Sequence, residues 1–211
     1  MKITGIVQAR IKSTRFPNKV LQEINGKTIV EVLFRRLSRS KKINKIIFAI
    51  PDNQGEKNLK KHILSLGCDL YEGSENDVLD RYYQSAKKFN SDIVVRITGD
   101  CPLVDPSLVD QMVLKLINNK LDFISNYSPP TYPDGLDVAV CTMKTLERAW
   151  TEAKNTSDRE HVMNYIINSK KFSKYNFNLE KNLSKYRWTI DEPEDFLVIK
   201  NIFNYFKNKP N

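Results

Sequence analysis

The sequence predicts an α/β fold in which a mostly parallel sheet lies between layers of helices, a three-layer α/β/α arrangement. Short apolar runs rich in β-branched residues alternate with segments of helical period, and this alternation is typical of β-α-β units. In the second half of the chain the order becomes less regular, which predicts an inserted, more antiparallel portion. There is no internal repeat and no low-complexity linker, so we expect residues 1–211 to form a single domain.

The first half of the chain contains four predicted pairs of strand and helix. In chain order they are strand 3–9, helix 28–39, strand 45–50, helix 54–66, strand 68–73, helix 77–89, strand 92–99 and helix 106–118. Each strand is a short apolar run, and each helix carries apolar residues at helical spacing. Thr28 and Glu31 have the spacing of a capping box. Pro106 stands at a first-turn position, where its missing N–H costs nothing.

The second half is expected to add two strands, several helices and two extended segments. They are strands 123–126 and 136–142, helices 143–153 and 157–168, extended segments 175–179 and 186–190, and a last helix from Pro193. Ser157 and Glu160 have capping-box spacing, which gives Glu160 a structural explanation.

Composition narrows the class of protein. The three cysteines are an odd number without C-x-x-C spacing, which argues against a disulfide framework and a zinc knuckle. No run of 18 uncharged apolar residues occurs, and the N-terminus leads directly into the first strand, so we expect a cytoplasmic protein with no membrane partner. The net charge of +9 fits binding to nucleic acid, to an acidic surface or to small anions, although much of the lysine is scattered over helices.

A concentration of positive charge follows the first strand. Arg10, Lys12, Arg15 and Lys19 stand within ten positions that contain no glycine. The glycine-rich motifs of P-loop ATPases and nicotinamide dehydrogenases are therefore missing here, and side chains must supply the charge. Arginine forks and lysine ammonium groups suit phosphate oxygens, and Ser13 adds a hydroxyl donor. A nucleoside triphosphate would match this loop, and the alternative is a loop of solvated cations.

Two aspartates are candidates for binding a metal ion. Asp100 follows the fourth strand in GDCPLVDP, and Asp191 precedes the last helix in WTIDEPEDF. Carboxylates and phosphate oxygens are ligands that Mg²⁺ prefers. From spacing alone, Asp100 could instead cap a turn, and Asp105 is better explained as the cap of helix 106–118. Asp191 or Glu192 could cap the last helix.

Several blocks together resemble one family. The segment QARIKSTRFPNKVL (8–21) resembles the signature A-R-x-x-S-x-R-x-P-G-K of sugar-nucleotide cytidylyltransferases, which activate 3-deoxy-manno-octulosonate and sialic acids with CTP. The blocks 96–106, 133–138, 158–162 and 188–196 are similar to the subfamily associated with spore-coat polysaccharide biosynthesis, and they span nearly the whole chain in order. Asn18 replaces the usual glycine, and asparagine tolerates a left-handed backbone.

The resemblance implies a Rossmann-like fold of the nucleotide-diphospho-sugar transferase (GT-A-like) type, and an Mg²⁺-dependent cytidylyltransferase that releases pyrophosphate. It implies that Asp100 and Asp191 hold Mg²⁺. The expected catalytic residues are Arg10, Lys19, Asp100 and Asp191. The expected nucleotide-binding residues are Gln8, Ala9, Arg10, Lys12, Ser13, Arg15, Lys19, Arg96, Thr98 and Asp100. Among these, Gln8, Ala9, Arg96 and Thr98 are candidates for reading the cytosine edge.

The acceptor side is less constrained. Asp134 and Asp137 in PDGLDV, and Arg159 and His161 in SDREHV, are candidates for binding an acidic or phosphorylated small molecule of cell-surface polysaccharide pathways. Asp134 is equally explained by turn chemistry, and His161 by a structural role. Relatives often dimerise, so we expect a homodimer. Two alternative functions remain: a GT-A-like glycosyltransferase, which normally carries a D-x-D motif that is missing here, and a nucleic-acid-binding module, for which no recognition motif is found.

Overall fold

The computed structural model describes residues 1–207, and its centre is a seven-stranded sheet in the order β5-β4-β1-β6-β8-β7-β9. Of these strands only β8 runs antiparallel to its neighbours. The strands are β1 (Ile3–Gln8), β4 (Lys45–Pro51), β5 (Asp69–Gly73), β6 (Ile93–Thr98), β7 (Phe123–Ser125), β8 (Ala139–Thr142) and β9 (Lys174–Asn176). The predicted mostly parallel sheet with an antiparallel insertion is confirmed.

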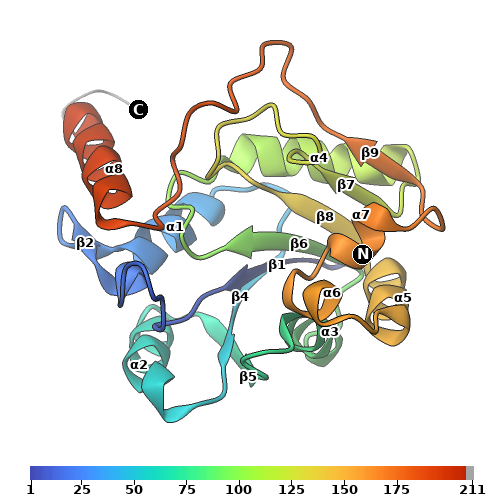
Figure 1. The fold of residues 1–211 in the computed structure, drawn as a ribbon, viewed down its shortest axis with the longest axis horizontal. Coiled ribbons are helices and arrows are strands. Elements are labelled where there is room, and N and C mark those ends of the chain that lie inside the picture. The colour runs from blue at the N-terminus through green and yellow to red at the C-terminus, as the bar shows by residue number, and fades with distance from the viewer. Residues whose placement is uncertain (208–211) are drawn as a thin grey trace.

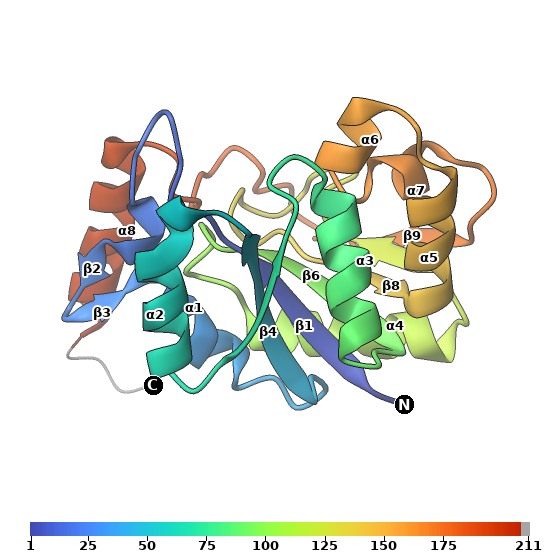
Figure 2. The same cartoon turned by 90° about the horizontal axis from the view of Figure 1, so that it is seen from below.

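Helices cover both faces of the sheet, as Figures 1 and 2 show. The core on one face joins Phe48 and Val95 of the sheet to α1, α2 and α4, and the core on the other face joins Ile6 and Val94 to α3, α5 and α7. The helices are α1 (Ile29–Leu37), α2 (Lys57–Ser65), α3 (Val78–Lys88), α4 (Pro106–Asn118), α5 (Met143–Glu152), α6 (Thr156–Glu160), α7 (Asn164–Asn168) and α8 (Pro193–Phe206). Short 3₁₀ turns occupy Lys19–Leu21 and Gln54–Glu56. None of the helices within residues 1–207 combines the length and apolar character needed to cross a membrane.

Two predicted helix starts are confirmed by their capping contacts. The Thr28 hydroxyl accepts a hydrogen bond from the Glu31 N–H at the start of α1 (3.2 Å). The Asp105 carboxylate accepts one from the Ser107 N–H at the start of α4 (2.8 Å). Each contact satisfies an N–H that has no partner inside its helix.

The sequence analysis did not find the small hairpin formed by β2 (Glu23–Ile24) and β3 (Lys27–Thr28). Its turn is Asn25-Gly26, with φ of 52° and 74°, which is the asparagine-glycine pattern of a tight hairpin. Ile24 of this hairpin packs with Ile190 and Ile199 in a third apolar cluster. Helix α8 therefore lies beside β2 at one side of the molecule (Figure 1).

One predicted element was wrong. The single helix expected at 157–168 is divided into α6 and α7, because Val162 has φ of 21° and is turned into the core together with Met163. The capping box expected at Ser157 is also corrected: Asn155 is the N-cap residue and Ser157 lies inside α6. Segment 186–190, expected to be extended, has a β contact in the form of an isolated bridge between Arg187 and Asp134.

The winding direction of the chain reverses between β1 and β6. The chain runs from β1 outward to β4 and β5, and then returns to β6 on the other side of β1. In open α/β sheets a ligand binds beyond the carboxyl ends of the strands at such a reversal. The two loops approach closely: a Cβ at Gly99 would lie 2.9 Å from the Gln8 carbonyl oxygen. The basic loop after β1 and the acidic loop after β6 are therefore neighbours.

Candidate active site

Backbone contacts hold the basic loop in place. Asn18 adopts the left-handed conformation (φ 58°), as expected for a residue that replaces glycine, and its N–H donates to the Ile11 carbonyl (3.1 Å). The buried Glu56 carboxylate, from the segment between β4 and α2, accepts from the Ile11 N–H at 2.9 and 3.1 Å. These bonds close the loop and fix the point at which the Lys19 side chain begins.

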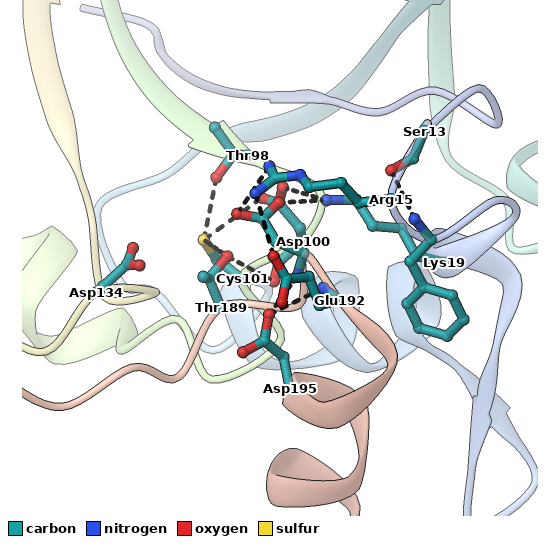
Figure 3. A network of polar contacts seen from close by, with 12 residues as sticks. Ser13, Arg15, Lys19, Thr98, Asp100, Cys101, Asp134, Thr189, Glu192 and Asp195 are labelled. Atoms are coloured by element: carbon teal, nitrogen blue, oxygen red, sulfur yellow. Dashed lines mark hydrogen bonds and ion pairs between the residues drawn. The ribbon is translucent and has the colours of Figure 1, made fainter.

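Lys19 joins the two predicted acidic segments. Its Nζ lies 2.8 Å from Asp100 Oδ2 and 2.8 Å from Asp191 Oδ1 (Figure 3). The three residues are far apart in sequence, and they come from the 3₁₀ turn after the basic loop, the end of β6 and the approach to α8. The structure therefore brings the predicted basic and acidic loops to one place.

The electrostatics of this trio reflect burial and pairing. Burial by itself raises the pKa of the Asp100 carboxyl, but the neighbouring Lys19 ammonium outweighs burial and the pKa is lowered overall. Burial likewise lowers the pKa of Lys19, but Asp100 and Asp191 outweigh it and the net shift is upward. Both directions favour the charged forms, so the trio is an ion pair network.

Asp191 has further cationic neighbours. Arg15 Nη2 and Arg187 Nη2 each lie 3.3 Å from Asp191 Oδ2. Asp195, rather than Asp191, accepts from the N–H groups at the start of α8, those of Asp191 and Glu192, at 2.9 Å each. The helix-cap alternative for Asp191 is therefore not what the structure shows, and its carboxylate is directed to the cations.

A cavity of about 250 Å³ opens beside the trio. Most of the predicted nucleotide and catalytic residues line it, and so does the proposed acceptor residue His161. The predicted residues at the cavity are Gln8, Ala9, Arg10, Ser13, Arg15, Lys19, Arg96, Thr98, Asp100, His161 and Asp191.

The structure does not place the other predicted residues on this cavity. Lys12 is exposed, and its Nζ lies 3.9 Å from Glu75 Oε1. Arg159 binds both oxygens of Asp77, the N-cap residue of α3, and donates to the Trp150 carbonyl, so its donors hold structure together. Asp134 lies 3.7 Å from Arg187, and Asp137 is half-buried before β8.

Sequence reasoning also missed several cavity residues. They are Val20, Glu75, Val78, Arg81, Gly99 and Glu160. Arg81 is the most notable, because it is 3% exposed and its buried Nε has no hydrogen-bond partner. Its position on an amphipathic helix gave no signal that distinguished it from a surface arginine. Glu160 was assigned to a capping box that does not form.

Comparisons with known proteins decide the family. A family model described as Cytidylyltransferase matches residues 4–205. This chain belongs to the cytidylyltransferase family. The resemblance in the sequence is confirmed, and the protein is a CTP-dependent cytidylyltransferase.

Relatives of this cytidylyltransferase span nearly its whole length. It is 38% identical to the uncharacterized protein MJ1063 of Methanocaldococcus jannaschii, over 98% of this chain and 85% of that protein. It is 30% identical to the spore coat polysaccharide biosynthesis protein SpsF of Bacillus subtilis, over 99% of this chain and 89% of that protein. The structure resembles a cytidylyltransferase from Leptospira borgpetersenii with a TM-score of 0.94 and 33% identity, covering 98% of this chain and 88% of that one.

The donor set of the cytidylyltransferase fits a divalent cation. One carboxylate oxygen of Asp100 and one of Asp191 each lie 2.8 Å from Lys19 Nζ, so the two carboxylates converge on a single point. Within residues 1–207 no group of three or more histidine, cysteine or acidic side chains gathers to hold a metal ion. Two carboxylates with substrate phosphates are a common ligand set for Mg²⁺, which keeps several water ligands.

Cys101 beside Asp100 is not a nucleophile of the cytidylyltransferase. The thiol is 3% exposed, and burial, with a further contribution from the Asp100 carboxylate, raises its pKa well above the ordinary value. A thiol must lose its proton to attack, so this cysteine is inert.

Asp137 makes the stability of the cytidylyltransferase depend on pH. Burial, and then the nearby Asp134 carboxylate, raises the pKa of Asp137 to about 6. Because the folded pKa lies above that of an unfolded aspartate, the free energy of unfolding falls as pH rises from about 4 to about 6 and stays reduced above that. Asp137→Asn should therefore increase stability at pH 7.5 by on the order of 1 kcal/mol and leave it unchanged near pH 4. Urea unfolding at the two pH values measures this, and an equal change at both would contradict the assignment.

Proposed function

We propose that this cytidylyltransferase binds CTP with Mg²⁺ in the cavity beside Lys19 and transfers the cytidylyl group to an acidic or phosphorylated small molecule. The product is a CMP- or CDP-linked compound for cell-surface polysaccharide synthesis, and pyrophosphate is released. One observation carries the proposal: Lys19, Asp100 and Asp191 meet at the end of the cavity lined by the basic loop.

The basic loop would bind the triphosphate through side chains. Arg10, Arg15 and Lys19 line the cavity with the hydroxyl groups of Ser13 and Thr14. A guanidinium offers a planar pair of donors to phosphate oxygens, and an ammonium offers a point charge. The loop contains no glycine-rich turn, so it supports recognition of phosphate by side-chain charge.

The chemistry needs positioning and neutralisation of charge. An oxygen of the acceptor attacks the α-phosphorus of CTP, a new P–O bond forms, and the bond to the bridging oxygen of pyrophosphate breaks. The charge that develops on the leaving pyrophosphate would lie against Arg10, Arg15 and Lys19, which line the cavity. A divalent cation held by Asp100 and Asp191 would neutralise phosphate oxygens and lower the pKa of an acceptor hydroxyl.

A second cavity supports an anionic acceptor. It has a volume of about 350 Å³ and shares Arg96 and His161 with the first cavity; its other lining residues are Tyr127, Met163, Asn164 and Ile167. The buried Nε of Arg96 has no hydrogen-bond partner, although Nη2 donates to Gln8 Oε1 at 3.3 Å. A permanent cation in the cavity lining, beside the Asn164 amide and the Tyr127 hydroxyl, suits a carboxylate or phosphate on a sugar-sized molecule. These features support an acceptor position beyond Arg96, rather than at Asp134 and Asp137.

Pyrophosphate release tests the proposed function. The enzyme is incubated with each of the four ribonucleoside triphosphates, with Mg²⁺ or with EDTA, against sets of sugar acids and sugar phosphates. We expect release with CTP and Mg²⁺ in the presence of one class of acceptor. Release with UTP or ATP in preference to CTP, or equal release in EDTA, would contradict the proposal.

Arg96→Met tests the position of the acceptor. We expect the KM for the acceptor to rise roughly 10- to 100-fold, because a charge-assisted contact is lost, while the KM for CTP changes little. Arg96→Lys should recover part of the loss. Steady-state kinetics with each substrate varied in turn measure both constants, and thermal unfolding confirms that the variants fold. A rise confined to the KM for CTP would instead assign Arg96 to the cytosine edge.

A further inference from the structure

Both carboxylates that fit a divalent cation are already paired with one ammonium group of the protein itself. The Lys19 ammonium lies 2.8 Å from each of them, and its side chain is only 10% exposed. The carboxylates of Asp100 and Asp191 are 25% and 22% exposed. An ion pair of this burial is screened much less by salt and water than a surface pair.

We propose that Lys19 is an internal counter-ion that keeps divalent cations from the nucleotide-free site, so that metal binds together with the triphosphate and not before it. The inference rests on the proposed function, because it concerns the order in which the two components of that reaction bind. It assigns to Lys19 a role in metal binding in addition to its contact with phosphate.

The local charge supports this order. Asp191 faces three cations, Lys19 at 2.8 Å and Arg15 and Arg187 at 3.3 Å, and Asp100 faces Lys19. Arg15 and Arg187 are shared with other carboxylates, because Arg15 lies 3.8 Å from Glu192 and Arg187 lies 2.8 Å from Asp195. Lys19 is therefore the cation that Asp100 and Asp191 have in common. A free divalent cation would meet two carboxylates that already share the buried Lys19 ammonium, and it would have to displace that ammonium without offering it another partner.

The number of metal ligands that the protein provides also supports binding of the metal together with the triphosphate. Only two carboxylates converge here, and no third acidic, histidine or cysteine ligand joins them within residues 1–207. Mg²⁺ demands near-octahedral oxygen coordination, and protein sites of this kind are completed by substrate phosphates and water. The protein therefore supplies an incomplete site, and the missing oxygens are those of the triphosphate.

The triphosphate also supplies the partner that Lys19 needs in order to leave. Lys19 lines the same cavity as Arg10 and Arg15, so phosphate oxygens bound there would lie within its reach. A lysine has a flexible four-carbon stem, so the ammonium can move from carboxylate to phosphate while the 3₁₀ turn Lys19–Leu21 stays in place. Metal and nucleotide would then increase each other's affinity by the same factor.

Calorimetric titration of Mg²⁺ and Mn²⁺ into nucleotide-free protein tests the proposal. We expect weak binding to the wild type and at least tenfold tighter binding to Lys19→Met, which keeps the length of the side chain and removes its charge. Lys12→Met is the matched control, because Lys12 carries the same charge on the same loop but is exposed and lies off the cavity. It should bind metal as the wild type does.

Two further variants identify the cause of the change. Lys19→Arg retains the positive charge and should bind metal as weakly as the wild type. In the double variant Lys19→Met with Asp100→Asn the increase in metal affinity should disappear, because one of the two carboxylates is gone. Thermal unfolding checks that each variant folds, and Lys19→Gln serves in place of the methionine variant if that chain does not fold.

Three results would overturn the proposal. They are an unchanged metal affinity in Lys19→Met, an equal increase in metal affinity in Lys12→Met, and an equal increase in Lys19→Arg. The proposed function is tested separately by pyrophosphate release from the wild type. If pyrophosphate is released from CTP but Lys19→Met does not bind metal more tightly, only the counter-ion role is rejected. If Lys19→Met binds metal more tightly but no pyrophosphate is released from CTP, the counter-ion role is supported and the proposed function is rejected.

Discussion

Asp100→Asn should lower cytidylyl transfer by about 10³-fold while the protein remains folded. The substitution removes one of the two carboxylates that converge on Lys19, and an amide neither neutralises that ammonium nor binds a divalent cation well. The shape of the side chain is retained, and the backbone bond from the Ile190 N–H to the Asp100 carbonyl (2.9 Å) is untouched. Pyrophosphate release at saturating CTP measures the loss, and circular dichroism with thermal unfolding checks the fold.

Asp105→Asn is the matched control, because it makes the same change in the same loop. Asp105 caps α4 and does not line the cavity, and asparagine is also a good N-cap residue. We expect this variant to keep nearly normal turnover and stability. Near-normal turnover in Asp100→Asn would reject the assignment of Asp100 to the catalytic site.

Gly135→Ala should cost the protein about 3–5 kcal/mol of stability, which is at the upper end for a single substitution. Gly135 has φ of +103°, and a Cβ there would lie 2.4 Å from the Trp188 carbonyl carbon and 2.4 Å from the Thr189 nitrogen. Both obstacles are backbone atoms, so they cannot move aside as the end of a side chain would. The Trp188 N–H donates a backbone hydrogen bond to the Asp134 carbonyl (2.6 Å), which holds the two segments together at the same point. Urea unfolding followed by fluorescence measures the loss.

Gly67→Ala separates steric clash from backbone strain in this experiment. Gly67 also has a positive φ, +73°, but a Cβ at this position would meet nothing within 4 Å. Only the backbone penalty remains, so we expect a loss of about 1 kcal/mol. If the two variants lost the same stability, the close packing of the 133–135 turn against segment 188–189 would not be the cause.

Much of the fold could be predicted because it depends on local pattern. The alternation of apolar runs with helical segments predicted the order of strands and helices through α4, and Thr28 and Asp105 cap the helices that follow them. Asn18 adopts the left-handed conformation that its replacement of glycine required. These features depend on the preferences of a few neighbouring residues.

The errors occurred where tertiary packing overrides local preference. Helical spacing continues through residues 157–168, yet the burial of Val162 and Met163 divides the helix. Arg159 seemed free to meet a substrate, but it is bound to Asp77 across the interface between α6 and α3. Arg81 reaches the cavity from within a helix that the sequence presents as an ordinary amphipathic surface helix.

The sequence by itself determined the α/β fold, the family, and the two loops that carry the opposite charges, because strand period, turn residues and short motifs are written in contiguous residues. Only the tertiary structure decided that Lys19, Asp100 and Asp191 meet, that Arg96 stands between two cavities, and that Glu192 and Asp195 form the capping box of α8 while Asp191 faces cations. The physical reason is that strand order and the crossovers between strands bring distant segments together, and the direction of each side chain is then set by the neighbours it meets.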